Sequence, residues 1–247
     1  LVINSIADVT LASTFRTNDD NGTPGKVIIN GTLRFLDESI VLNGVGELEL
    51  NGYTELKAGA FNDHFQLSGS QQINLSSSIE YTNTVSSISL INTPTATFGS
   101  LINNVSASGN LTVIDNIIIT GTLTMQTGMI ITNSVTLSIG SSTSNIGSLN
   151  YQSGFIHGVL KRWFSGTNSG NSSGLYPISK NGTDKRFIKV EYTEATDGGS
   201  IKAEWINTQM GYNLNSDTIS TSCNGSFVIE NTDNGYWQMT PNDGITT

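Results

Sequence analysis

The sequence has 247 residues and carries 20 Asp and Glu against 11 Lys and Arg, which gives a net charge of −9 and an isoelectric point near 4.5. This balance argues against nucleic acid or an anionic membrane surface as a partner, since both require clustered Lys and Arg. The 27 Asn, 31 Ser, 30 Thr and 26 Gly residues, with few strong helix formers, predict a turn-rich, all-β protein.

Targeting and redox features are few. The single cysteine, Cys223, permits no internal disulfide, and its simplest interpretation is a small buried apolar residue. The sequence begins without Met and has neither a basic-then-apolar leader nor an apolar run of about 18 residues. We therefore expect no membrane-spanning element, and we expect the chain to be a segment of a longer polypeptide.

The first repetitive stretch, residues 23–60, places apolar pairs between corners at Asn30-Gly31, Asn43-Gly44 and Asn51-Gly52. One residue separates the two members of each pair, which is the alternation of a short strand with one buried face. The pairs are Val27/Ile29, Leu33/Phe35, Ile40/Leu42 and Leu48/Leu50. Short strands that turn at regular corners can stack coil upon coil, so this pattern predicts a β-solenoid with unequal sides, for which we favour right-handed winding.

The pattern loosens over residues 61–109 and tightens again over residues 110–140. The loose part holds apolar pairs at Ile73/Leu75, Ile79/Tyr81 and Ile88/Leu90 among Ser-rich turns. The tight part returns to an aliphatic residue every six positions, and we expect these residues to face the core. They form two series, Leu111, Ile117, Leu123, Met129 and Val135, and Val113, Ile119, Met125, Ile131 and Leu137. Residues 1–152 are therefore predicted to form one parallel β-solenoid.

From residue 153 onward the predicted strands become longer and richer in aromatic residues. They cover residues 155–164, 186–193, 200–206, 226–230 and 235–239. Longer strands with separate loops predict a β-sandwich module over residues 153–247. Trp163, Trp205 and Trp237 all lie in this part, and we expect them to anchor its core.

Motifs of this second part resemble the region that follows repetitive β segments in adhesin-like surface or secreted proteins of Bacteroidota. The matching positions are Gly158, Lys161-Arg162, Tyr176-Pro177, Arg186-Phe187 and Gly235-Tyr236-Trp237. The resemblance covers about residues 150–245, while the solenoid is similar only in style. It implies a fold of repetitive β segments followed by a β module, and export by the type IX secretion system to the cell surface or medium.

The resemblance also implies partners and a modification. The partners would be the type IX secretion machinery during export and the remainder of a longer polypeptide, with surface glycans as adhesive targets. The triplet Asp217-Thr218-Ile219 is similar to the O-glycosylation motif of those bacteria, which makes Thr218 a modification site by resemblance. The sorting domain that ends such cargo is not found in these residues.

The main enzymatic alternative is a polysaccharide lyase or hydrolase, because elongated β-solenoids offer long surfaces to sugar chains. Such an enzyme needs carboxylates, or a carboxylate and a base, that converge on one face. Glu47 and Glu49 alternate with leucines, so they are predicted to form the outer side of one strand. The bases in residues 1–150 are Arg16, Lys26, Arg34 and Lys57, and we find none that repeats at coil spacing with Asp or Glu.

Other chemistry has weaker support. The run from Asn18 to Gly22 could offer oxygen ligands to calcium, but it lacks the spacing of an EF-hand loop, and a polar turn is favoured. His64 and His157 stand alone, and no nucleophile, phosphate-binding or dinucleotide motif accompanies them. A threonine surface for ice would need a strict Thr-x-Thr pattern, which fails at Ile118 and Ile130. We expect no catalytic residue, no metal and no cofactor, and we predict a non-catalytic structural or adhesive segment.

Overall fold

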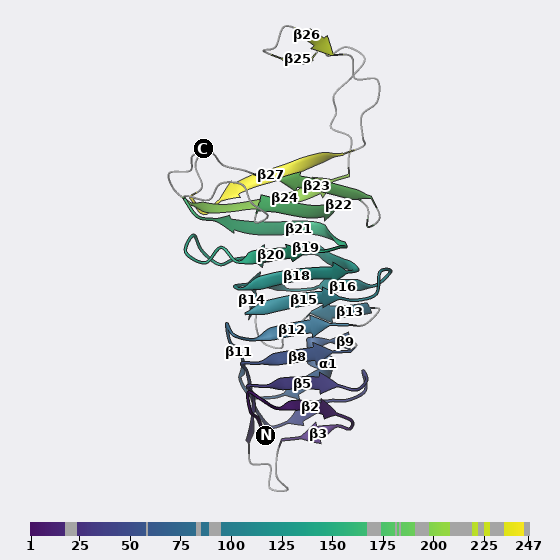
Figure 1. Ribbon diagram of the computed structural model, residues 1–247, viewed down its shortest axis with the longest axis vertical. Coiled ribbons are helices and arrows are strands. Elements are labelled where there is room, and N and C mark those ends of the chain that lie inside the picture. Colours follow the sequence, from purple (N-terminus) through teal and green to yellow (C-terminus); the bar gives the residue numbers. More distant parts are fainter. Residues whose placement is uncertain are drawn as a thin grey trace.

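The computed structural model describes residues 1–17, 24–57, 59–82, 85–88, 95–166, 174–180, 182, 184–190, 198–207, 219–221, 225–227 and 235–244. The described part of the chain is nearly all β, with 63% strand and 3% helix. The strands stack as parallel coils into an elongated β-solenoid of about 6 turns, with the N-terminus at one end (Figure 1). The predicted all-β class and the parallel β-solenoid are confirmed.

Three parallel sheets form the sides of the first coils. The first sheet contains β1 (Val2–Ile3), β4 (Gly25–Ile29), β7 (Gly46–Leu50) and β11 (Gln71–Ile73). The second contains β2 (Asp8–Leu11), β5 (Thr32–Phe35), β8 (Tyr53–Leu56), β12 (Ser78–Tyr81), β15 (Ser100–Asn104), β18 (Thr122–Thr127) and β20 (Ser148–Tyr151). The third contains β3 (Phe15–Arg16), β6 (Leu42–Gly44) and β10 (Phe65–Leu67). The chain thus passes through the three sheets in turn and then returns to the first.

A fourth, 11-stranded sheet closes the later coils. Its parallel strands are β9 (Gly59–Ala60), β13 (Val85–Ile88), β14 (Thr95–Phe98), β16 (Asn110–Val113), β17 (Asn116–Ile119), β19 (Met129–Ile139) and β21 (Phe155–Phe164). The first half of β19 pairs with β16 and its second half pairs with β17. This long strand therefore spans two sides of the coil. The short helix α1 (Phe61–His64) lies between β9 and β10.

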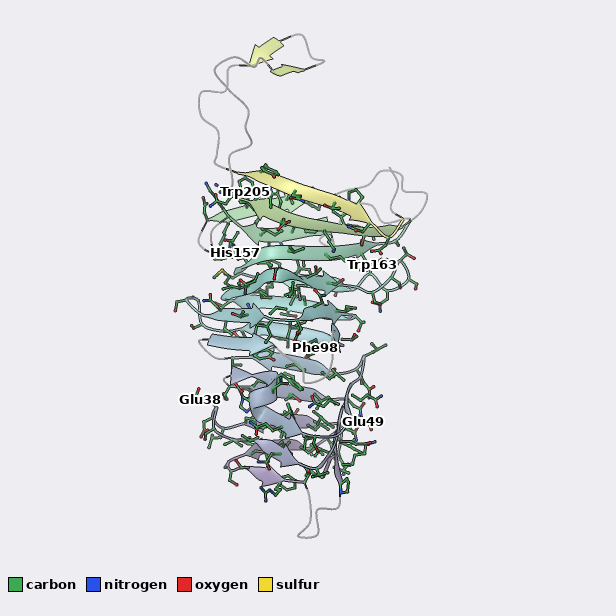
Figure 2. All side chains as sticks on the ribbon, turned by 180° about the vertical axis from the view of Figure 1, so that it is seen from behind. Glu38, Glu49, Phe98, His157, Trp163 and Trp205 are labelled. Carbon is green, nitrogen blue, oxygen red and sulfur yellow. The ribbon has the colours of Figure 1, made fainter. Side chains whose placement is uncertain are left out.

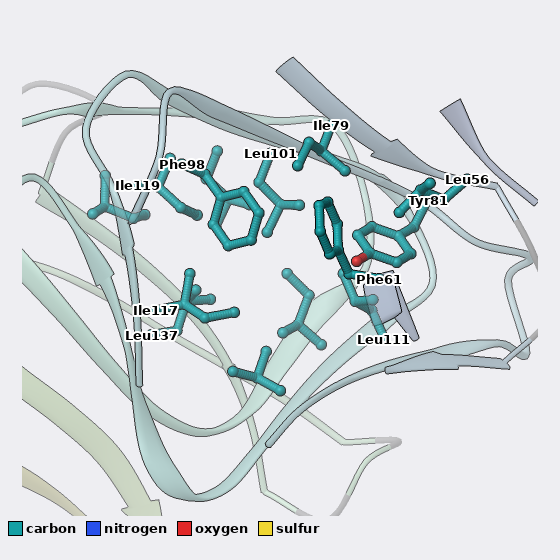
Figure 3. Close-up of a cluster of buried hydrophobic side chains, with 14 of the residues drawn as sticks. Leu56, Phe61, Ile79, Tyr81, Phe98, Leu101, Leu111, Ile117, Ile119 and Leu137 are labelled. Carbon is teal, nitrogen blue, oxygen red and sulfur yellow. The ribbon is translucent and has the colours of Figure 1, made fainter. Parts of the chain in front are cut away.

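The core is a set of ladders in which equivalent residues of successive coils lie one above another. In the second sheet, one inward ladder consists of Leu33, Thr54, Ile79, Leu101, Leu123 and Leu149, spaced 21 to 26 residues apart. Figure 3 shows such side chains from several strands meeting inside the coil. Each fully buried aliphatic side chain contributes about 1.5–3 kcal/mol, so these ladders dominate the stability of the stack.

The corners explain why the sequence repeats glycine and asparagine. A Cβ atom on Gly52 would lie 2.1 Å from the carbonyl oxygen of Gly31 in the coil below, so only glycine allows the coils to approach this closely. Beside this corner, the side-chain amides of Asn30, Asn51 and Asn74 form a ladder, in which Asn51 Nδ2 donates to Asn30 Oδ1 over 2.8 Å. The Asn30-Gly31 and Asn51-Gly52 corners therefore serve stacking. Asn43 and Gly44, which were also predicted as a corner, instead form the end of β6.

The inward positions follow the predicted pairs with two exceptions. The pairs at Val27/Ile29, Leu33/Phe35, Ile40/Leu42 and Leu48/Leu50 are buried, as are Leu111, Val113, Ile117, Ile119, Leu123, Met125 and Leu137. Leu75, by contrast, follows β11 in a turn and is 66% exposed. The side chains of Ile88 and Leu90 lie outside the described part of the structure.

The second exception is a shift of one position in the six-residue series. Gly128 adopts a left-handed φ of 77°, and after it Ile130 and Thr132 face the core in place of Met129 and Ile131. The hydroxyl of the buried Thr132 accepts a hydrogen bond from the Val159 amide over 2.7 Å. The two faces of β19 are therefore exchanged over residues 129–132, because side chains alternate along a strand. After Asn133, which has a left-handed φ of 44°, the predicted phase returns and Leu137 faces the core.

The β-sandwich predicted for residues 153–247 is not confirmed. β21 pairs in parallel with β19 and so continues the solenoid sheet, and β24 (Gly199–Ile206) and β27 (Tyr236–Asn242) extend it with antiparallel pairing. β22 (Leu175–Ser179) joins the other half of β21 and pairs with β23 (Lys185–Lys189). β25 (Ile219–Thr221) and β26 (Gly225–Phe227) form a separate antiparallel pair. The division at residue 152 stays a prediction.

Candidate functional site

The predicted carboxylate pair lies on the first sheet, near the N-terminal end of the stack, where Figure 2 labels Glu49. Glu47 is exposed and Glu49 is half-buried on the outer side of β7, as predicted. Glu49 is held by Lys26 of the preceding coil, with 2.9 Å between Nζ and Oε2, and by Asn51, whose Nδ2 lies 3.0 Å from Oε1. These bonds lower the pKa of Glu49, with the Asn51 bond as the largest cause. Both of its oxygens are therefore occupied.

A second group of charges lies on the outer side of the second sheet. Arg34, Glu55 and Glu80 occupy successive coils, since Arg34 is the register partner of Glu55 and Glu55 that of Glu80. Arg34 bonds to Glu55 and to Asp8, and Lys57 Nζ lies 2.7 Å from Glu55 Oε1. Bases therefore do repeat with carboxylates at coil spacing. The prediction that no base in residues 1–150 does so was wrong, because the length of a coil is not visible in a six-residue repeat.

The groups around Glu55 favour its ionised form. Burial alone would raise the pKa of Glu55, but the hydrogen bonds from Lys57 and Arg34 outweigh burial and lower it. The Tyr53 hydroxyl donates to Glu80 Oε2, and burial followed by this bond raises the pKa of Tyr53. Asn104 donates to Glu80 Oε1 over 2.8 Å. Each of these glutamates thus has both oxygens engaged by neighbouring side chains.

A groove lies on the outer side of the fourth sheet near the C-terminal end of the stack, and we call it the lysine groove. It consists of two adjoining hollows of about 210 and 340 Å³ that share Thr136 and Lys202. The first is lined by Asn116, Ile117, Ile118, Thr136, Ser138, Ser141, Lys161, Trp163 and Lys202. The second is lined by Ser134, Thr136, Val159, Lys202, Ala203, Glu204, Gln238, Thr240 and Asn242. These residues come from β17, β19, β21, β24 and β27 and from the ends of these strands.

The floor of the lysine groove is one row of residues that crosses the strands. Ile118, Ser138, Lys161, Lys202 and Thr240 are successive register partners, one from each strand. Ser138 is small and 6% exposed, so it leaves a depression between longer neighbours. Five strands spaced by about 4.8 Å give the row a length of about 19 Å.

Neighbouring groups hold Lys161, which belongs to this row, and Trp163, which lies two positions further along β21. Lys161 Nζ lies 2.6 Å from Asp243 Oδ2 and 4.7 Å from the centroid of the Trp163 ring. The Lys161 bond is the largest cause of the lowered pKa of Asp243, and the bond from Ser200 is the next. Lys202 has no carboxylate within ion-pair distance among the described residues, although its charge also lowers the pKa of Asp243. Lys202 is therefore the cation most available to a bound molecule.

The outward position of Trp163 corrects one expectation. Trp205 and Trp237 pack against the core and meet edge to face, with 5.7 Å between ring centroids. Trp163 instead lies on the outer side of β21, on the same face as Lys161, and Figure 2 shows it at the end of the strand opposite His157. The sequence signal that could have identified this is its position in the opposite phase to Leu160 and Phe164, whose apolar side chains are buried.

Two titratable side chains, those of His64 and Arg162, lie in the interior of the solenoid. His64 is fully buried, its ring stacks on Phe35 with 4.2 Å between centroids, and its Nδ1 lies 2.9 Å from the Ile40 carbonyl oxygen. Arg162 is also fully buried, and its Nη1 donates to the Leu175 carbonyl over 2.9 Å. Burial lowers the pKa of Arg162 to about 10. His157 is half-buried in β21.

Several predicted positions fall outside the described residues. These are the polar run from Asn18 to Gly22, the cysteine Cys223 and the modification site Thr218. Across the described ranges, no three His, Cys, Asp or Glu side chains lie together in a way that could hold a metal ion. The same ranges contain no helix that is long and apolar enough to cross a membrane.

Comparison with known proteins does not extend this description. No family model matches the sequence, and neither the curated proteins nor the solved structures give a match. The class of protein that the fold defines is a parallel β-solenoid with an outer groove. The resemblance to exported Bacteroidota proteins stays a prediction.

Proposed function

We propose that this chain is a non-catalytic structural and adhesive segment of a large secreted or cell-surface protein. The observation that carries the proposal is the continuous ladder of buried side chains from Leu33 to Leu149, which joins the coils into one stiff stack. With about 6 turns at about 4.8 Å each, the stack extends about 29 Å along its axis. Such an element suits a stalk that displays a surface at a distance.

The state of the carboxylates supports a role without catalysis. General acid or base chemistry needs a carboxyl oxygen that can reach a substrate proton. In Glu49, Glu55 and Glu80 both oxygens already bond to neighbouring side chains. Glu47 is exposed, but the carboxylate beside it on the strand is the occupied Glu49.

A screen on a panel of polysaccharides tests this proposal. The purified chain is incubated with each polymer, and both its retention and the release of new reducing or unsaturated ends are measured. We expect no released ends, with retention on a subset of polymers. Release of new ends would contradict the structural and adhesive role and favour the polysaccharide-degrading alternative, and its loss in Glu47→Gln would assign the activity to the Glu47/Glu49 face.

Export is the second part of the proposal, and it rests on the resemblance at Lys161-Arg162, Tyr176-Pro177 and Gly235-Tyr236-Trp237. We infer that the parent polypeptide is type IX secretion cargo that reaches the cell surface or medium, with the secretion machinery as a transient partner. An antibody against this segment should label intact cells or the medium. Labelling that persists in a strain without the type IX machinery would contradict this route. Mass spectrometry of the exported protein should find a glycan on Thr218.

The lysine groove favours a second candidate function, polysaccharide binding. It combines an aromatic ring, two lysines and many hydroxyl and amide groups on one outer face. This candidate is compatible with adhesion, because binding without cleavage is what an adhesive surface requires.

A further inference from the structure

We propose that the lysine groove binds an acidic carbohydrate chain, with a carboxylate or sulfate group of one sugar between Lys161 and Lys202. This inference rests on the adhesive function proposed above and names the class of target. It begins with the two lysines, which are directly opposed register partners on β21 and β24. Like charges that face each other across a strand pair destabilise a sheet. Asp243 forms an ion pair with Lys161 alone, so a bound anion that also contacts Lys202 would relieve the remaining repulsion.

The balance of charge around the groove also favours an anion. Asp243 occupies one side of Lys161, while Lys202 has no carboxylate at ion-pair distance in the described residues. The first hollow, which contains both lysines, has no acidic residue in its lining. On the inner side of the same strand, Arg162 is fully buried, and its Nε and Nη2 have no hydrogen-bond partner in the described part of the chain. Its charge makes the potential at the groove more positive, in contrast to the net charge of −9 of the whole sequence.

The neutral part of the lining suits sugar rings. The ring of Trp163, with Lys161 Nζ over it, lines the first hollow and adds an amphipathic aromatic surface that suits the C–H groups of a sugar. Further along the groove, Asn116, Thr136, Gln238 and Thr240 present amide and hydroxyl groups that can bond to sugar hydroxyls. A length of about 19 Å accommodates a short run of sugar units.

The direction of the groove favours a carbohydrate over an acidic peptide. A peptide usually adds to a sheet at a free edge, where it bonds to unpaired backbone groups. The groove instead crosses the strands, and both β21 and β24 are paired on their two sides, β21 with β19 and β24 and β24 with β21 and β27. Binding between Lys161 and Lys202 must therefore use side chains, which is the usual mode for a sugar chain.

The experiment measures binding of tetragalacturonate to the purified chain by titration calorimetry and by tryptophan fluorescence. The same tetrasaccharide with its carboxyl groups reduced to alcohols and a hexaglutamate peptide serve as comparisons. We expect saturable binding of tetragalacturonate that weakens with salt, and about tenfold or greater weakening in Lys202→Gln, because one charged contact is lost. Trp163→Phe should lose the fluorescence change.

Matched variants separate the groove from general electrostatics. Lys57→Gln removes the same charge from the second sheet and should leave the affinity unchanged, and circular dichroism should show that both lysine variants fold. Equal binding of the reduced tetrasaccharide, preferred binding of hexaglutamate or undiminished binding by Lys202→Gln would each overturn the inference while leaving adhesion elsewhere on the chain intact. If the chain did not bind tetragalacturonate but was retained on other polysaccharides, the inference about the lysine groove would also be overturned. If the chain were retained on no polysaccharide, the adhesive function itself would be overturned.

Discussion

Thr54 interrupts an aliphatic ladder, and its replacement by Val should stabilise the solenoid. Thr54 is fully buried in β8, with Leu33 and Ile79 as its register partners in the neighbouring coils. Its Oγ1 atom has no hydrogen-bond partner among the described residues. Val has nearly the same shape and replaces the hydroxyl with a methyl group, so Thr54→Val removes a buried polar group without opening a cavity.

The size of the effect follows from the cost of that hydroxyl. A buried hydroxyl without a partner costs about 1–3 kcal/mol in proteins, so Thr54→Val should raise the free energy of unfolding by about 1–2 kcal/mol. For a chain of this length, each kcal/mol shifts Tm by about 2–4 °C. Thermal unfolding followed by circular dichroism gives Tm. Amide hydrogen exchange in β5, β8 and β12 should slow in the same variant, because coils of a solenoid are stabilised by their neighbours.

The matched control is Thr122→Val on the outer side of β18. The Thr122 hydroxyl lies 2.7 Å from Ser148 Oγ at the surface, so its replacement should change the free energy of unfolding by no more than about 0.5 kcal/mol. A lower Tm in Thr54→Val than in the unmodified protein would refute the reasoning, since it would mean that the buried hydroxyl makes a favourable bond.

Three further outcomes follow from the ladders and the groove. Leu101→Ala, in the middle of the inner ladder, should lower the free energy of unfolding by about 3–5 kcal/mol through loss of buried area and a residual cavity, measured by urea unfolding. Gly52→Ala should cost about 1–3 kcal/mol in the same assay, because its Cβ would lie 2.1 Å from the Gly31 carbonyl oxygen and the coils would have to separate. Asp243→Asn should reduce Tm at pH 7. Since the Lys161 bond lowers the pKa of Asp243 in the folded state, its contribution is present above the ordinary carboxyl pKa of about 3.9 and is lost as pH falls through the lowered value. The difference in Tm between Asp243→Asn and the unmodified protein should therefore shrink below about pH 4, and a difference that stays constant down to pH 2 would contradict this account.

The local pattern of the sequence determined most of the solenoid. Pairs such as Leu33/Phe35 and Leu48/Leu50 predicted both the strands and their buried faces, since alternation along a strand is a property of the backbone. The corners at Asn30-Gly31 and Asn51-Gly52 were also readable from sequence, because glycine at a corner reflects how closely the next coil approaches. These features depend on residues within a few positions of one another.

Tertiary structure decided everything that depends on which coils lie side by side. The spacing of 21 to 26 residues between coils brings Arg34 against Glu55, and it is not visible in a six-residue repeat. The left-handed φ of Gly128 exchanges the faces of residues 129–132 at the start of β19. Antiparallel pairing of β24 with β21 sets Lys202 opposite Lys161. Long-range pairing of this kind is fixed by the total energy of the stacked sheets. A single inserted residue can change the pairing partners of the strand that follows it. The groove depends on this pairing, so it exists only in the folded protein.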